Sequence, residues 1–181
     1  MSIITAAVVL LAAVCALQLL LTIGVIRRLR EHTDALAGLA QSPASLGVGD
    51  EVGTFSSATV DGEPVERDSI TGETLVAFFT PGCGPCEKRL PEFVSYAGSS
   101  AGMRDRPIAV VVAAEVGDAD VYVEALRPVA RVFVQDSDGA LCRAFQVTAF
   151  PTVLMVAPER DGRVVITADR IRLDQPASVP A

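Results

Sequence analysis

The sequence predicts an α/β domain with a mixed parallel and antiparallel sheet flanked by helices, preceded by a single N-terminal transmembrane helix. Strand and helix signals alternate after Asp50, which is typical of α/β domains. Two runs within this region, Thr74–Phe79 and Pro107–Ala113, are almost continuously apolar, as in strands buried on both faces. Finally, the stretch Ile3–Ile26 contains no charged residue. The chain of 181 residues suits one domain with an appendage.

The N-terminal apolar segment has the length of a membrane span, which needs about 20 mainly apolar residues. A cleavable signal peptide normally has a basic start and a shorter apolar region, and no Lys or Arg precedes this one. We therefore expect an uncleaved single-pass anchor over residues 1–30, with Cys15 as an ordinary small apolar residue of the span. A buried core helix is the alternative interpretation.

The remaining chain divides into a juxtamembrane helix and linker (31–49), a folded domain (50–169) and a flexible tail (170–181). Glycine, proline and small residues mark the linker, and the tail is polar and contains proline. Within the domain, the pattern predicts a strand at Phe55–Val60 with a turn at Asp61-Gly62, a strand at Thr74–Phe79, a helix from just after Cys83 to about Ala97, a strand at Pro107–Ala113, a helix at Ala119–Leu126, a strand at Arg131–Val134, a helix at Gly139–Phe145, and a hairpin of Thr152–Val156 with Arg163–Ala168.

The charge of the chain limits its partners. The formal net charge is −7 at pH 7, and the acidic excess lies in the folded domain. Nucleic acids attract basic proteins, so we expect no nucleic-acid partner. The expected membrane partner is the lipid bilayer that surrounds the anchor.

The pair Cys83-Gly84-Pro85-Cys86 is the main chemical signal in the sequence. It follows an apolar strand and opens the predicted helix, so the two sulfurs would lie one turn apart on nearly the same face. At the helix N-terminus the unpaired N–H groups stabilise a thiolate, which makes Cys83 the expected nucleophile. Pro85 suits the first turn, where its missing N–H is no loss. Cys86, one turn further in, would displace a partner from a mixed disulfide.

Zinc binding and a structural disulfide fit this cysteine pair less well. Zinc needs four ligands, whereas the chain has one histidine, His32 near the anchor, and no second pair of this type. A structural disulfide closing so short a loop adds little stability. We expect no metal, and no cofactor other than the dithiol itself. The fourth cysteine, Cys142, is expected to be buried and inert.

A second element is Ala149-Phe150-Pro151-Thr152, directly before the strand that starts at Thr152. A cis peptide bond before Pro151 would place Phe150 beside the cysteines. From spacing alone, a trans proline that starts an edge strand is equally compatible.

With FFTPGCGPC, a helix that carries Pro91, and AFPT before a strand, residues 47 to 168 resemble the thioredoxin superfamily. The long anchor and the hairpin before the cysteine strand are similar to membrane-anchored thiol–disulfide oxidoreductases of the TlpA/ResA type, and to the accessory proteins of methylamine dehydrogenase. The resemblance implies that Cys83 is the nucleophile, Cys86 the resolving thiol and Pro151 a cis-proline. It further implies that Phe150, Pro151 and Thr152 contact the client, with Gly84 and Pro85 tuning the site.

The sequence departs from this family at three positions near the site. Gly82 stands where the family usually has tryptophan, Ala77 where thioredoxin has a buried acid, and Arg89 where an acidic residue is common. The proton-transfer group for Cys86 is therefore not identified by the resemblance, although Glu87 and Glu92 are near in sequence.

The resemblance implies a reductase or isomerase of protein disulfides, since Gly-Pro between the cysteines is the thioredoxin pattern. The implied clients are apocytochromes, copper-centre proteins or one enzyme under maturation. The implied electron donor is a membrane thiol carrier, because the chain has no nucleotide-binding glycine motif. The alternatives are a thiol peroxidase, for which Val76 stands where that class has proline, and a client-binding or copper-handling module without enzyme activity.

Two features conflict over the side of the membrane on which the domain lies. Arg27, Arg28 and Arg30 follow the span, and the positive-inside tendency would place the domain in the cytoplasm. The family works outside the cytoplasmic membrane, where disulfides persist. We expect the extracytoplasmic side, because the charge rule is a bias.

Overall fold

The computed structural model describes residues 5, 7–12, 18, 44–99 and 105–173. The chain divides into two compact units, Met1–Ser42 and Pro43–Ala181. In the first unit the described residues are helical. No helix within the described part of the chain is long and apolar enough to cross a bilayer. The predicted anchor over 1–30, including Cys15 and the three arginines, lies largely outside the described residues, as does most of the predicted linker.

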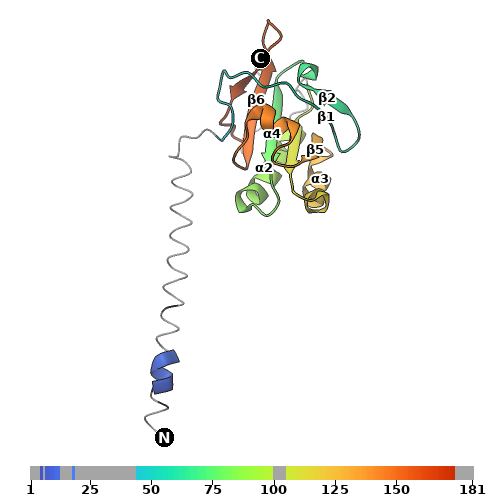
Figure 1. Cartoon of the computed structure of the whole chain (residues 1–181). Coiled ribbons are helices and arrows are strands. Elements are labelled where there is room, and N and C mark those ends of the chain that lie inside the picture. The colour runs from blue at the N-terminus through green and yellow to red at the C-terminus, as the bar shows by residue number, and fades with distance from the viewer. Residues whose placement is uncertain (1–4, 6, 13–17, 19–43, 100–104, 174–181) are drawn as a thin grey trace. The chain divides into compact units, whose positions relative to one another are not determined.

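The second unit is built on a five-stranded mixed sheet (Figure 1). Its strand order is β5-β4-β3-β6-β7. The strands in this order are Arg131–Gln135, Ile108–Val112, Thr74–Phe79, Thr152–Pro158 and Val164–Ala168. Strands β3, β4 and β5 are parallel, whereas β6 runs antiparallel to β3 and β7 antiparallel to β6. The predicted mixed sheet and the predicted final hairpin are thus confirmed.

The central strand β3 is buried along its whole length. All six residues of Thr74–Phe79 are buried, and so are all five of β4. A strand covered on both faces cannot alternate apolar and polar side chains, which explains the continuous apolar runs in the sequence. Thr74 is the polar exception in β3, and its hydroxyl donates to the carbonyl oxygen of Gly72 at 3.0 Å.

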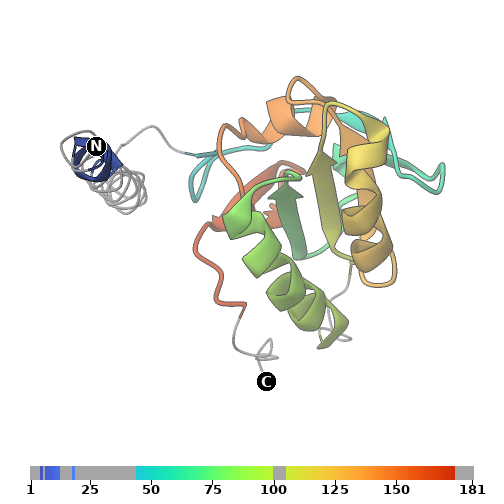
Figure 2. The ribbon, with the colours of Figure 1, turned by 90° about the horizontal axis from the view of Figure 1, so that it is seen from below.

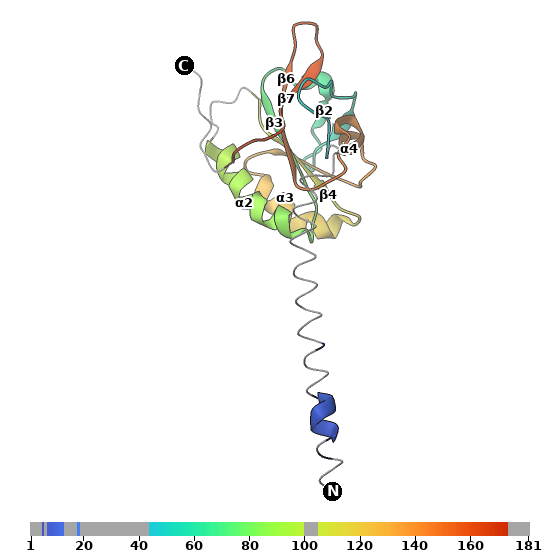
Figure 3. The ribbon, with the colours of Figure 1, turned by 90° about the vertical axis from the view of Figure 1, so that its left-hand side faces the viewer.

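Three α-helices cover the two faces of this sheet (Figure 2). Helices α2 (Gly84–Ser99) and α3 (Asp120–Leu126) pack on one face, where Phe79 lies 5.6 Å from Phe93 between ring centroids. Helix α4 (Ala140–Phe145) packs on the opposite face. Figure 3 shows α2 and α3 side by side. All three helices were predicted, with ends that differ by one or two residues.

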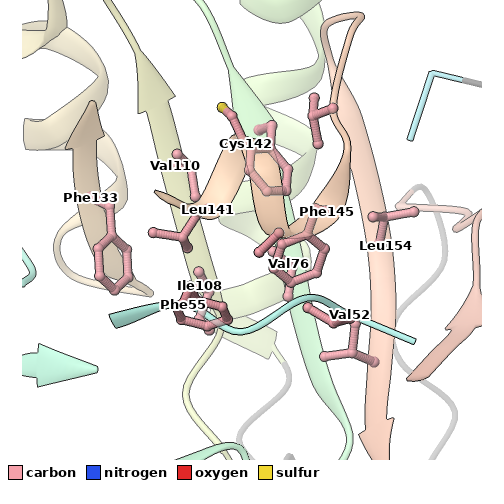
Figure 4. Close-up of a cluster of buried hydrophobic side chains, with 14 of the residues drawn as sticks. Val52, Phe55, Val76, Ile108, Val110, Phe133, Leu141, Cys142, Phe145 and Leu154 are labelled. Atoms are coloured by element: carbon pink, nitrogen blue, oxygen red, sulfur yellow. The ribbon is translucent and has the colours of Figure 1, made fainter. Parts of the chain in front are cut away.

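The core on the α4 face is a layer of aromatic and branched side chains (Figure 4). The ring of Phe145 lies 5.4 Å from that of Phe78 and 6.1 Å from that of Phe55. Phe55 and Val52 come from the extended segment before the first strand, which also pairs with the sheet through an isolated bridge from Glu51 to Val165. The segment ahead of β1 is therefore part of the fold.

A small hairpin precedes the cysteine strand, as the sequence predicted. Strands β1 (Ser56–Ala58) and β2 (Pro64–Glu66) pair antiparallel, and β1 is shorter than expected. The hydroxyl oxygen of Thr59 accepts the N–H groups of Asp61 and Glu63, and Gly62 has a φ of 79°. Two short 3₁₀ helices complete the secondary structure, Arg67–Ser69 and Val116–Ala119.

The chain after β7 was expected to be a flexible tail from residue 170. Its first residues instead pack on the α2 face. Leu173 is 5% exposed, Ile171 lies against the same core, and the guanidinium of Arg89 donates to the carbonyl oxygen of Ile171 at 3.1 Å. The remainder of the predicted tail lies outside the described residues.

Asp105 ties the loop before β3 to the chain before β4. Its carboxylate accepts the N–H groups of Thr71 and Gly72 at 2.8 and 2.7 Å and the Thr71 hydroxyl at 3.1 Å. Burial alone would raise the pKa of Asp105, but these hydrogen bonds hold it below its ordinary value.

We predict that Asp105→Asn lowers the free energy of unfolding by about 1 kcal/mol at pH 7, because the variant loses hydrogen bonds to a charged carboxylate. The loss is no larger because solvent weakens hydrogen bonds to a half-exposed group. A lowered pKa stabilises the fold above the ordinary aspartate value near 4, and this contribution disappears as the pH falls through the folded-state pKa. Denaturant titrations at several pH values should therefore converge in acid. Asp118→Asn, at an exposed aspartate, is the matched control; equal losses in both variants would contradict the assignment.

Candidate active site

Cys83 lies at the end of the loop that follows β3, and helix α2 begins at the next residue, Gly84. The loop is held in place because the Thr80 hydroxyl donates to the carbonyl oxygen of Val112 in β4 at 2.8 Å. Gly82 has a φ of 71°, a conformation that side chains rarely adopt, which gives a backbone reason for glycine at this position. Pro85 occupies the first turn of α2, as predicted.

The two thiols differ strongly in exposure. Cys83 is half-buried, whereas Cys86 is completely buried in the core on the α2 face. Both are free thiols, so the structure describes the dithiol form of the site. Cys83 is therefore the accessible sulfur of the pair, while Cys86 is screened by the domain.

The proline loop lies against Cys83, as the family resemblance implied, whereas spacing alone had left the proline isomer open. The Phe150–Pro151 peptide bond is cis, and the Cys83 thiol donates to the carbonyl oxygen of Phe150 at 3.7 Å. The Thr152 hydroxyl donates to the carbonyl oxygen of Ala149 at 2.7 Å, which fixes the start of β6. The structure thus brings together two segments that are 67 residues apart in the chain.

The electrostatics of the site keep Cys86 protonated at neutral pH. Burial, followed by its hydrogen bond with Cys83, raises the pKa of Cys86 to about 12. The charged form of a sulfur is poorly solvated in an apolar core, so the thiol is the stable species there. The site consequently contains one accessible sulfur, that of Cys83, and one buried sulfur, that of Cys86, which remains a thiol.

Tyr122 on α3 is a neighbour of this site that the sequence analysis missed. It is 6% exposed, and its hydroxyl is buried with no hydrogen-bond partner among the described residues. Burial and the nearby Cys86 raise the pKa of Tyr122. Ala77, on β3, is fully buried in the same core. The only sequence signal for Tyr122 was its place in the predicted helix at Ala119–Leu126.

A groove of about 840 Å³ adjoins the site. Pro85 and Arg89 of α2 line it, together with residues 44–47, 151–154 and 169–172. Of the predicted client-contacting residues, Pro151 and Thr152 are part of its wall. Four separate segments of the chain form this groove, so no local pattern could have indicated it.

Cys142 does not join the pair. It is buried on α4 in the core of the opposite sheet face, where the Gln135 side-chain amide donates to its sulfur at 3.3 Å. Burial raises the pKa of Cys142. Within the described residues, no group of three or more His, Cys, Asp or Glu side chains is placed to hold a metal ion.

The order of the strands, the flanking helices and the cysteine pair at the start of α2 define a thioredoxin-like α/β fold. The solved structures that it resembles include the thioredoxin domain of a thiol–disulfide oxidoreductase from Bacteroides vulgatus, with a TM-score of 0.58 and 18% identity over 71% of this chain and 91% of that one. A thiol:disulfide interchange protein from Chlorobium tepidum gives a TM-score of 0.51 and 25% identity, covering 66% of this chain and 86% of that one.

In sequence, the chain is similar to the sporulation thiol-disulfide oxidoreductase A of Bacillus subtilis. The two are 24% identical over 104 residues, which is 56% of this chain and 63% of the relative. The match thus spans less than two thirds of the relative's length. No protein-family model matches the chain. Together these similarities show a thioredoxin-like fold, and the proteins named in them are thiol–disulfide oxidoreductases and interchange proteins.

We predict that iodoacetamide alkylates Cys86 in a Cys83→Ser variant about tenfold faster for each unit of pH from about 8 to 11. The rate should not level off in this range, because the thiolate fraction of a group with a raised pKa keeps rising. Mass spectrometry of proteolytic peptides follows the reaction at Cys86 separately from Cys15 and Cys142. The same variant in denaturant should level off near the ordinary thiol value. A plateau near pH 9 in the folded protein would contradict the burial argument.

Proposed function

We propose that the protein is a membrane-tethered thiol–disulfide oxidoreductase that reduces disulfide bonds of client proteins through Cys83 and Cys86. The observation that carries the proposal is the contact of the accessible Cys83 thiol with the cis-proline loop, above a second thiol that is fully buried. The resemblance of the fold to thiol–disulfide oxidoreductases supports it.

The reaction has two exchange steps. In the first, the Cys83 thiolate attacks one sulfur of the client disulfide. The S–S bond of the client breaks, a mixed disulfide forms, and the second client sulfur leaves as a thiolate that takes up a proton. In the second, Cys86 attacks the Cys83 sulfur. The mixed disulfide breaks, and the proton of Cys86 passes through solvent to the departing client thiolate. The client gains two electrons and the protein becomes a disulfide.

The site residues divide this work. Cys83 is the nucleophile and Cys86 the resolving thiol, which stays protonated until the mixed disulfide forms beside it. Phe150, Pro151 and Thr152 form the surface on which the client backbone lies. Gly84 and Pro85 allow the helix to start between the two sulfurs. The dithiol is the only redox group that the mechanism needs.

One feature supports reduction over oxidation: the Gly-Pro dipeptide between the cysteines is the thioredoxin pattern. Oxidised protein is returned to the dithiol by a membrane thiol carrier, and the clients are apocytochromes, copper-centre proteins or one enzyme under maturation.

We predict that Cys86→Ser accumulates disulfide-linked adducts with client proteins, because Cys83 still attacks but no thiol resolves the product. Non-reducing electrophoresis and mass spectrometry of the purified full chain would detect the adducts, and dithiothreitol should release them. The double variant Cys83→Ser/Cys86→Ser is the control. If Cys86→Ser traps no more protein than the control, the protein does not exchange disulfides with clients, and a binding-only module becomes the better interpretation.

The proposed location is the outer side of the cytoplasmic membrane, with the domain held by the apolar segment. We predict that a membrane-impermeant maleimide labels Cys83 in intact cells after mild reduction, because the half-buried thiol is reachable from outside. The Cys83→Ser variant should lose this label. Labelling that requires cell lysis would place the domain in the cytoplasm, as Arg27, Arg28 and Arg30 suggest, and would remove the extracytoplasmic clients.

A further inference from the structure

The groove beside the cysteines runs along an open edge of the sheet. Strand β7 pairs with β6 only from Met155 onward, where Met155 lies opposite Ala168. Within the described chain, residues 152–154 of β6 therefore have a strand partner on the β3 side only. These residues line the groove together with Pro151. A half-paired strand leaves a row of backbone N–H and C=O groups that an extended peptide can join. Here most of that row is covered, since Thr152, Val153 and Leu154 are 7, 8 and 1% exposed.

The rim of this groove is basic although the domain is acidic. Arg89, Arg170 and Arg172 line it, against one acidic lining residue, Asp169. Arg170 and Arg172 are exposed. Arg89 donates to Ile171 and lies 3.4 Å from Glu92, which uses two of the five guanidinium donors. The groove thus carries a local positive potential on a chain whose net charge is −7.

The position of these arginines allows them to contact a bound client, but not the reacting sulfurs. They line the groove together with Pro85 and Pro151, whereas neither Cys83 nor Cys86 is among its lining residues. A peptide that pairs with residues 152–154 would carry its neighbouring side chains past this rim. Guanidinium groups bind carboxylates with paired hydrogen bonds, and charges placed around a binding groove select partners of the opposite sign.

We propose that this groove selects client segments that carry carboxylates near the reacting cysteine, with Arg170 and Arg172 as the specificity-determining residues and Arg89 as a further contact. The inference rests on the proposed function and specifies its substrate class: acidic, extended protein segments. Arg89, at the position where the family commonly has an acid, gives this chain the opposite charge at the inner end of the groove.

The test compares two synthetic peptide disulfides that differ only in the residues beside the cysteine, aspartate in one and asparagine in the other. The reduced full chain in detergent reacts with each, and the second-order rate constant is measured at low salt. We expect the aspartate peptide to react about tenfold faster, since two partly exposed ion pairs together contribute roughly that factor. In Arg170→Gln/Arg172→Gln the ratio of the two peptide rates should fall to about twofold, the share left to Arg89.

Arg160→Gln is the matched control, because it removes one positive charge from an exposed arginine at the β6–β7 turn, away from the groove. It should keep the full preference, and added salt should reduce the preference of the unaltered protein.

Equal rates for the two peptides in the unaltered protein, or a preference that survives the double variant undiminished, would overturn the inference and leave the proposed function intact. If neither peptide reacts and Cys83→Ser behaves identically, the proposed function itself fails. If the double variant loses binding to phosphatidylglycerol vesicles but not peptide selectivity, the arginines belong to a lipid contact and the inference is wrong.

Discussion

The complete burial of strand β3 is the constraint on which the site depends. Because Thr74–Phe79 is covered on both faces, the strand cannot shift its register without exposing aromatic side chains or burying polar ones. Its end therefore fixes the loop at Thr80 and the start of helix α2. The same strand pairs with β6, which starts directly after the cis-proline. One buried strand thus positions both the cysteine pair and the loop that faces it.

The geometry of the site assigns unequal tasks to two chemically identical side chains. Cys83 stands at the surface of the domain against the Phe150 carbonyl, and Cys86 stands one helical turn deeper in the core. Desolvation makes the thiolate of Cys86 unfavourable, so it does not compete for the client. This division follows from burial, with no charged side chain required at Ala77, where thioredoxin has a buried acid. Besides the thiol of Cys86, this core contains the buried hydroxyl of Tyr122 as a polar group.

The groove beside the cysteines is formed mostly by parts of the chain other than the cysteine motif. The groove is made by residues 151–154 around the start of β6, the segment 169–172 that packs under Arg89, the chain at 44–47, and Pro85 and Arg89 of α2. Apart from Pro85, none of these residues belongs to the cysteine motif. Packing of Ile171 and Leu173 holds the backbone against α2, while the arginines between and before them remain at the surface. The packing of these two apolar side chains thereby holds the basic rim at the surface. Such a rim allows a domain with net negative charge to attract an acidic segment.

The sequence by itself determined the elements and the chemistry. Apolar runs at Thr74–Phe79 and Pro107–Ala113 are typical of strands covered on both faces, and a cysteine pair directly after such a strand has a defined local geometry at a helix start. What the sequence left open was decided by tertiary structure. The isomer before Pro151, the depth of Cys86, the packing of residues 170–173 and the groove all depend on contacts between segments far apart in the chain. Local patterns report the preferences of neighbours in sequence, whereas burial and long-range pairing arise only when the sheet is assembled.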